Sequence, residues 1–461
     1  DIVNSSPAYS SESNTVFIGA NDGMMHAFNA ATGAELFAYI PGIVNLTNLK
    51  TLADKAYDHR YFVDGPLAVS AKKLTPNKNI LVGSLGRGGK GLYALDVTTP
   101  ATFDGSKALW EVSGSDDDMG FITSRPIITK ANNGSTVVIV SNGLNSTNDD
   151  PALFIYDLFT GTRLAKLLPI EKGGNDVFDN NGLSAATGVD QDVDGDVDYM
   201  YAGDMKGNVW KFDLSDNNPN NWEVANNDYP LYSAKDSTGT ITQSISGGIA
   251  IGFDAEFNPW LYFGTGRYLT AGDPSTTSVQ TWYGIVDEST NTTIAGRGAL
   301  KARKIVAAGE LDNGSGTGVK VRAFEPQEFP SGVSDMYGKK GWYIDLVNPP
   351  FTAAQKVGER IVGTPVVRGT TVLVSSIIPS EDPCTVEGSG YVNAVDALTG
   401  SSGVYGSESY FDVNGGGFDN DKLVSTIDGR EISIGSIDLG IKMPTDALVL
   451  AGDTNELVVV G

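Results

Sequence analysis

Cysteine and histidine are almost absent from this chain of 461 residues. Cys384 is the single cysteine, so no disulfide can form within the chain, and its pairing with a residue elsewhere stays open. His26 and His59 are the only histidines, and no partner motif accompanies either of them. Neither Gly-x-Ser-x-Gly nor His-Glu-x-x-His occurs. We therefore expect both histidines to be structural and the chain to be no enzyme.

Basic residues and long apolar runs are also scarce. The chain has 32 Lys and Arg against 56 Asp and Glu, which gives a net charge of −24. Nucleic acids and anionic membrane surfaces are bound through basic patches, so both are poor partners. No apolar run approaches the ~18 residues that would cross a bilayer. The first residue is Asp1, with neither an initiator Met nor a signal sequence, so we expect a part excised from a longer protein.

Acidic residues, by contrast, are concentrated in one segment, Asp190–Asp198, which holds five carboxylates in nine residues. Alternating side chains and a glycine at the sixth position are typical of a Ca²⁺ loop. The predicted ligands are the side chains of Asp190, Asp192, Asp194 and Asp198 and the carbonyl of Asp196. The alternative is a solvated acidic loop.

The segment differs from an EF-hand, because Tyr201 stands where the bidentate Glu would be and no flanking helix is evident. Residues 199–204 instead predict a strand that leads into a turn. Hard oxygen ligands without His or Cys favour Ca²⁺ over zinc or copper, and Mg²⁺ resists an all-protein cage. Asp116–Asp118 lacks the alternating spacing, which favours a solvated turn over a second ion site.

Glycine, with 56 residues, and short apolar runs indicate an all-β fold built from repeats. Each repeat consists of an apolar strand that ends at Gly or Ser, a turn, and a second strand that ends at Asp or Asn. The first strands are Val16–Gly19, Ile80–Gly83, Val138–Ser141, Tyr201–Gly203, Leu261–Gly264 and Val372–Ser375. Their partners are Met25–Asn29, Leu92–Asp96, Phe154–Asp157, Val209–Asp213, Tyr283–Asp287 and Val392–Asp396.

The spacing of these repeats predicts a β-propeller. Consecutive end residues from Gly19 to Gly264 are 58–64 residues apart, as expected for four-stranded blades with long loops. The step to Ser375 is 111 residues, which we interpret as an insertion at about 295–355 within the fifth blade, with Tyr343–Asp345 as its outer strand. The tail, from Met443 to Val460, supplies a further unit that would pair with the first residues. We predict one modified seven-bladed propeller over 1–461, with eight blades as the alternative.

Several segments resemble the C-terminal domain of the PilY/PilC family, tip-associated factors of bacterial type IV pili. They include Phe17–Phe28, His59–Pro66, Val82–Gly89, Tyr201–Asp204, Gly264–Tyr268 and the Asp382–Cys384 region with the strand after it. The resemblance covers essentially the whole chain.

The resemblance implies a calcium-binding propeller with quinoprotein-like blades, which acts in pilus assembly and surface attachment. Calcium occupancy would control pilus extension against retraction and thereby twitching motility. The implied partners are pilins or minor pilins and a host or abiotic surface, and the implied location is the periplasm or outer membrane, at the pilus. This chain has no Arg-Gly-Asp sequence, so integrin binding through that motif has no support.

Two other functions are compatible with a propeller. A periplasmic quinoprotein dehydrogenase of the PQQ type would use a central cavity, but a lone Cys384 excludes the adjacent-cysteine disulfide common in that class. A lectin-like, carbohydrate-binding propeller is the third possibility.

Overall fold

The computed structural model describes residues 1–169, 181–380, 388–451 and 456–461. Cys384, and with it the question of its pairing, lies outside these residues. The described chain divides into two compact units, which are considered separately. Unit 1 contains 1–169, 181–205 and 210–229, and unit 2 contains 206–209 and the described residues from 230 onward. No helix among the described residues is long and apolar enough to cross a membrane.

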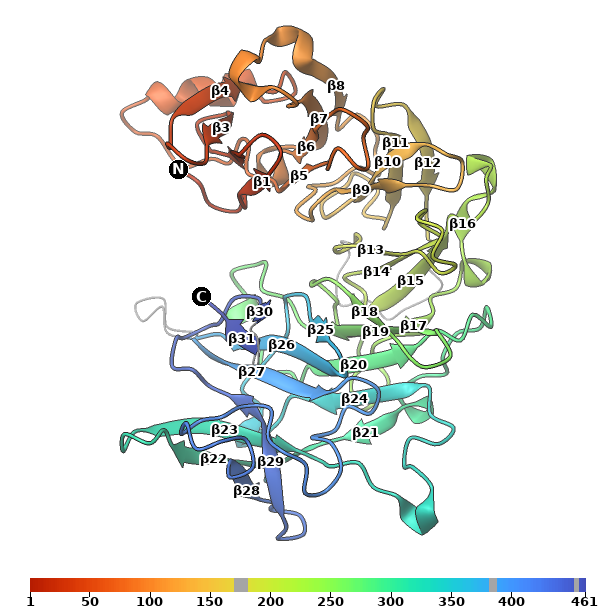
Figure 1. Ribbon diagram of the computed structural model, residues 1–461, viewed down its shortest axis with the longest axis vertical. Coiled ribbons are helices and arrows are strands. Elements are labelled where there is room, and N and C mark those ends of the chain that lie inside the picture. The colour runs from red at the N-terminus through yellow and green to blue at the C-terminus, as the bar shows by residue number, and fades with distance from the viewer. Residues whose placement is uncertain (170–180, 381–387, 452–455) are drawn as a thin grey trace. The chain divides into compact units, whose positions relative to one another are not determined.

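The sheets of the first half are antiparallel and follow the order of the chain (Figure 1). The first sheet contains β1 (Ala8–Ser10), β2 (Thr15–Gly19), β3 (Met25–Asn29) and β4 (Glu35–Tyr39). The second contains β5 (Leu67–Val69), β6 (Ile80–Ser84), β7 (Gly91–Asp96) and β8 (Ala108–Ser113). The third contains β9 (Ile127–Lys130), β10 (Thr136–Ser141), β11 (Leu153–Asp157) and β12 (Arg163–Leu167). The fourth contains β13 (Thr187–Val189), β14 (Tyr199–Gly203), β15 (Asn208–Asp213), β16 (Glu223–Val224) and β17 (Tyr232–Ser233).

Unit 2 has larger and more irregular sheets. One contains β18 (Ala250–Phe253), β19 (Pro259–Gly264), β20 (Thr281–Val286), β24 (Gly341–Asp345) and β21 (Lys301–Arg303). Another contains β22 (Ile305–Asp312), β23 (Gly318–Phe324), β29 (Glu431–Ile437), β27 (Ser389–Asp396), β26 (Thr371–Ile378) and β25 (Val366–Arg368), with β28 (Lys422–Val424) beside β29. The last is the hairpin of β30 (Leu448–Ala451) and β31 (Glu456–Val459).

The six predicted repeats are confirmed, because each forms two adjacent antiparallel strands in the interior of a sheet. Val16 of β2 faces Phe28 of β3, for example, and Val372 of β26 faces Val395 of β27. The strands β1, β5, β9 and β25 each begin directly after a proline, where a missing N–H costs no ladder bond. The predicted helix is shorter than expected: α1 spans Leu46–Leu49 and a 3₁₀ turn follows at Lys50–Ala53, and neither has a buried face that would extend it.

The long segment between the fifth and sixth repeats contains strands that belong to two different sheets. β24 pairs with β20, in the place expected for an outer strand, so β21, β22 and β23 are inserted before it. β23 then pairs with β29 and joins the next sheet. The number of blades stays a prediction, since the described sheets range from two to seven strands.

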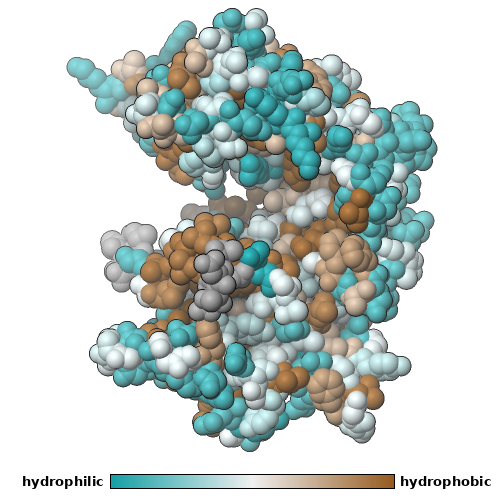
Figure 2. Space-filling model, viewed as in Figure 1, coloured by the Kyte–Doolittle hydropathy of each residue, from teal (hydrophilic) through white to brown (hydrophobic). Residues whose placement is uncertain are grey.

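The hairpin of β30 and β31 carries an apolar face, and Figure 2 shows apolar side chains gathered over it. Leu448, Leu450, Leu457 and Val459 are all exposed, and Leu448 faces Val459 while Leu450 faces Leu457. The predicted pairing of this tail with the first residues of the chain concerns both units and stays a prediction.

Apolar layers fill the space between successive sheets. On β10, Val137 and Ile139 belong to the layer shared with Met200 and Trp210 of the fourth sheet. The alternate residues of β10 face the second sheet instead, where Val138 is buried in the same cluster as residues of β6 and β7. A central strand is therefore buried on both faces, which explains why these strands appear in the sequence as continuous apolar runs.

A buried charge network links strands of unit 2 that are far apart in the sequence. Arg322 of β23 makes a two-pronged ion pair with Glu359, with N–O distances of 2.7 and 2.9 Å, and both side chains are almost fully buried. Arg322 also donates to Ser436 of β29 (3.0 Å) and Asn393 of β27 (2.7 Å). Its guanidinium lies 3.6 Å from the ring centroid of Tyr391.

Replacing Arg322→Met should lower the free energy of unfolding of unit 2 by about 3–5 kcal/mol, because it leaves Glu359 buried and unpaired. The exposed Lys320 on the same strand provides a control, and Lys320→Met should change stability by no more than about 0.5 kcal/mol. Urea unfolding of the two variants measures the difference. Equal stabilities would show that the network contributes nothing.

Candidate functional site

The acidic segment Asp190–Asp198 forms the connection between β13 and β14, as the sequence predicts. The two strands are antiparallel, with Val189 facing Tyr199, so the loop begins and ends at one place. Gly195 has φ +101°, a conformation that other residues rarely adopt, and nothing would obstruct a side chain there. The backbone angle, not crowding, therefore calls for glycine at the sixth position.

Three of the predicted ligands come together in this loop. One carboxylate oxygen from each of Asp190, Asp192 and Asp194 lies within 4.8 Å of the other two. Asp190 also holds the turn, because its carboxylate accepts from the N–H of Asp194 (3.1 Å) and of Gly195 (2.8 Å). Asp196 and Asp198 do not belong to this group of three oxygens.

Asp198 fixes the end of the loop against its beginning. Its side chain is buried, and Oδ2 accepts from the N–H of Gln191 at 2.7 Å. Nδ2 of Asn132 donates to Oδ1 of Asp198, to the carbonyl of Val197 and to the carbonyl of Leu214, each at 3.1 Å. Asn132 lies 66 residues before Asp198, so no local sequence signal could have identified it.

Desolvation and neighbouring like charges both disfavour ionisation of carboxylates in the loop. Desolvation, followed by the carboxylates of Asp194 and Asp198, raises the pKa of Asp192. Desolvation and the carboxylate of Asp194 likewise raise the pKa of Asp196. No Lys or Arg in the described chain makes an ion pair with a carboxylate of this loop. Converging hard oxygens without a cationic side chain suit a divalent cation of the Ca²⁺ type.

The Asp116–Asp118 turn is different, because two of its three carboxylates make ion pairs within the described chain. Nζ of Lys166 lies 3.0 Å from Asp116 and 2.6 Å from Asp118, and Arg163 pairs with Asp116 as well. The expected solvated turn is in fact a salt-bridged one, and it has no need of a metal ion.

The two histidines also contact carboxylates. The ring of His26 lies between Glu35 (2.6 Å) and Asp22 (2.9 Å), and His59 is 3.0 Å from Asp1. Glu35 and Asp22 raise the pKa of His26 despite its partial burial, which lowers it. Both contacts are compatible with the structural roles expected from the sequence.

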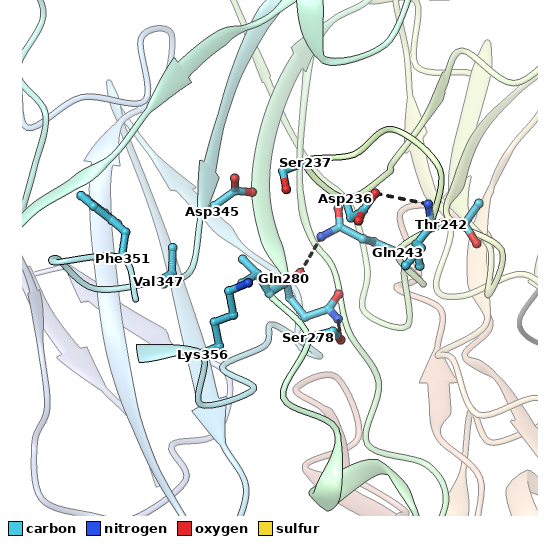
Figure 3. Close-up of a pocket in the computed structure, with 12 residues that line it drawn as sticks. Asp236, Ser237, Thr242, Gln243, Ser278, Gln280, Asp345, Val347, Phe351 and Lys356 are labelled. Atoms are coloured by element: carbon cyan, nitrogen blue, oxygen red, sulfur yellow. Dashed lines mark hydrogen bonds between the residues drawn. The ribbon is translucent and has the colours of Figure 1, made fainter. Parts of the chain in front are cut away.

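A pocket of about 320 Å³ lies within unit 2, with Phe351 and Val347 on one side and Asp236 and Gln243 on the other (Figure 3). Two of its polar side chains are engaged in the fold. Nε2 of Gln243 donates to the carbonyl of Val279 at 2.9 Å. The carboxylate of Asp345 pairs with Arg297.

Comparison with known proteins identifies the family. The family model of the PilY1 beta-propeller domain matches residues 3–314. The chain belongs to the PilY1 family. A PilY1 homologue of Xylella fastidiosa, named a type IV pilus biogenesis factor, is 38% identical over 400 residues, which cover 84% of this chain and 26% of that protein. PilY1 of Pseudomonas aeruginosa strain PAO1 is 33% identical over 416 residues, covering 84% of this chain and 34% of that protein.

The solved C-terminal domain of Pseudomonas aeruginosa PilY1 has the same fold. It superimposes with a TM-score of 0.74 and 27% identity, covering 97% of this chain and 90% of that domain. The predicted all-β propeller fold is thereby confirmed. The chain spans about a quarter to a third of the length of its PilY1 relatives.

Replacing Asn132→Ala should destabilise unit 1 by about 1–3 kcal/mol, because Asp198 and two carbonyls lose their donor. The matched control is Asn133→Ala, since Oδ1 of Asn133 accepts only one local bond, from the N–H of Ser135. Urea unfolding of both variants measures the difference. If the two variants are equally stable, Asn132 does not anchor the loop.

Proposed function

We propose that this chain is the non-enzymatic, calcium-binding propeller of a type IV pilus biogenesis factor. Calcium occupancy of the Asp190–Asp198 loop would regulate pilus extension against retraction, and with it twitching motility and surface attachment. The observation that carries the proposal is the convergence of oxygens from Asp190, Asp192 and Asp194 within 4.8 Å. Membership of the PilY1 family supports the link to pili.

The donor set fits Ca²⁺ chemically. Carboxylates of Asp190, Asp192, Asp194 and Asp198 and the carbonyl of Asp196 would hold the ion, and a bound divalent cation would offset their mutual repulsion. The loop joins β13 to β14, and Asn132 ties its last residue to the neighbouring sheet. Ordering of the loop would therefore be transmitted to the surface around these strands, where a contact with a pilus component could be strengthened or weakened.

The proposal places the protein in the periplasm or outer membrane and at the cell surface on the pilus. Its partners would be pilins or minor pilins and a host or abiotic surface. Two features favour a role without catalysis: the relatives are named as biogenesis factors, and both histidines are engaged with carboxylates.

Asp190→Ala and Asp198→Ala should each weaken calcium binding by this loop more than about tenfold, since each removes a ligand or the side chain that closes the cage. Glu223→Ala is the control, because it removes an exposed carboxylate of β16 and changes the net charge equally. Isothermal titration with Ca²⁺ measures the affinity. Wild-type isotherms for both loop variants would refute the calcium site.

The regulatory part of the proposal is tested in cells that produce the full-length protein. Pilus number and twitching should respond to external calcium with the wild-type sequence and with Glu223→Ala, but not with Asp198→Ala. Pili are counted by electron microscopy, and twitching is measured as the spreading zone beneath agar. An unchanged calcium response in the Asp198→Ala strain would mean that the ion is structural and does not regulate pili.

A further inference from the structure

A second acidic loop lies in unit 2, at residues 412–421, immediately before β28. Its sequence is Asp-Val-Asn-Gly-Gly-Gly-Phe-Asp-Asn-Asp. It lacks the strict alternation of the first loop, so its local sequence gives no clear signal of a metal site. In the structure, however, it contains a buried carboxylate that the protein leaves incompletely bonded.

That carboxylate is Asp421, which is only 1% exposed. Oδ2 accepts from the N–H of Val413 at 3.1 Å, but Oδ1 is buried and has no hydrogen-bond partner. Asp421 makes no ion pair within the described chain, and the charge that acts on it is the carboxylate of Asp412. A buried carboxylate with an unsatisfied oxygen beside another carboxylate is costly unless a cation compensates it.

Protonation does not resolve this arrangement. A neutral Asp421 would carry an O–H that needs an acceptor, or an unprotonated Oδ1 that needs a donor, and Oδ1 has neither within hydrogen-bond distance. The position is also fixed by the fold. The carbonyl of Asp421 accepts from the N–H of Ile434 at 3.1 Å, and Lys422 faces Ser433 where β28 pairs with β29.

Two other oxygen-bearing side chains of the loop, Asp412 and Asn414, are held in place by its own backbone. The carboxylate of Asp412 accepts from the N–H of Gly415 (2.8 Å) and of Gly417 (3.3 Å). Oδ1 of Asn414 accepts from the N–H of Gly416 at 2.7 Å. A Cβ on Gly416 would lie only 2.7 Å from that same oxygen, so the interior of the loop has no room for a side chain there.

The wrapping of the chain matches that of the first loop. Asp190, like Asp412, accepts from two N–H groups of the turn, and Gly195 (φ +101°), like Gly417 (φ +104°), bends the backbone. In both loops the last Asp accepts through Oδ2 from the residue that follows the first Asp. The main evidence for a cation site is the unpartnered Oδ1 of Asp421, and the similar backbone path of the two loops is consistent with it.

We propose that Asp412, Asn414 and Asp421 form a second cation site, which binds a hard divalent ion, Ca²⁺ in preference to Mg²⁺. The site lies in unit 2 and is independent of the Asp190–Asp198 loop. Two carboxylates and an amide carry less charge than the first loop offers. Its dissociation constant should therefore fall near the weak end for calcium sites, about 10⁻⁴–10⁻³ M.

The test uses the 461-residue chain with Asp190→Ala and Asp198→Ala together, which removes two predicted ligands of the first loop, and adds Ca²⁺ alone. Equilibrium dialysis should still find about one bound ion, and the melting temperature should rise with calcium. Adding Asp412→Asn, at an exposed position, or the isosteric Asp421→Asn should weaken this binding at least about tenfold. Asp438→Asn, in the turn after β29, is the control and should change nothing.

The stability of each variant without calcium shows whether a loss of binding results from misfolding. Asp421→Asn should be at least as stable as its parent without calcium, because the amide removes an uncompensated buried charge. The proposal is overturned if the chain with the disrupted first loop binds no calcium. It is also overturned if binding survives both Asp412→Asn and Asp421→Asn. Either result would mean that a buried water, and not a cation, is the partner of Oδ1 of Asp421. Failure of the first loop would appear separately, as the absence of calcium binding by a chain that carries Asp421→Asn alone.

Discussion

Close approach of the chain at the ends of β2 and β19 is a constraint on which the packing of the neighbouring sheets depends. A Cβ on Gly19 would lie 2.4 Å from the carbonyl oxygen of Val63, and one on Gly264 would lie 2.1 Å from Cβ of Ile361. In each case the chain that enters the following sheet passes directly over the glycine. Only a very small residue allows this crossing, and the apolar layers between sheets can close because it does.

The clustered carboxylates of this acidic chain are found in two different environments. At Asp116 and Asp118 the fold supplies two cationic side chains, Lys166 and Arg163, which together form ion pairs with both carboxylates. In the Asp190–Asp198 loop the carboxylates converge without such a partner in the described chain. The contrast matters because both segments appear in the sequence as clusters of Asp. The function of an acidic cluster thus depends on what the opposing strand offers, which a local pattern does not contain.

The strands were predictable from the sequence because each repeat keeps its own local signals: an apolar run, a small residue and a terminal Asp or Asn. The same holds for the acidic loop, whose spacing is contained in nine residues. Contacts across long separations were not predictable. Asn132 reaches Asp198 from another sheet, and Arg322 meets Glu359 and Ser436 only after the chain has folded back. The sequence around those residues does not distinguish them from ordinary polar positions. The apolar runs, in turn, do not indicate how many strands each sheet contains.

The placement of β29 has a consequence for the order in which unit 2 is built. This strand is synthesised late, yet it lies between β23 and β27 and supplies Ser436 to Arg322, 114 residues earlier. Before β29 packs against β23, Arg322 lacks one of the groups that it contacts in the folded unit. Such distant pairings form slowly, because a long stretch of chain must first be closed into a loop. Until β29 is in place, the edges of β23 and β27 that it covers stay unpaired and open to other strands.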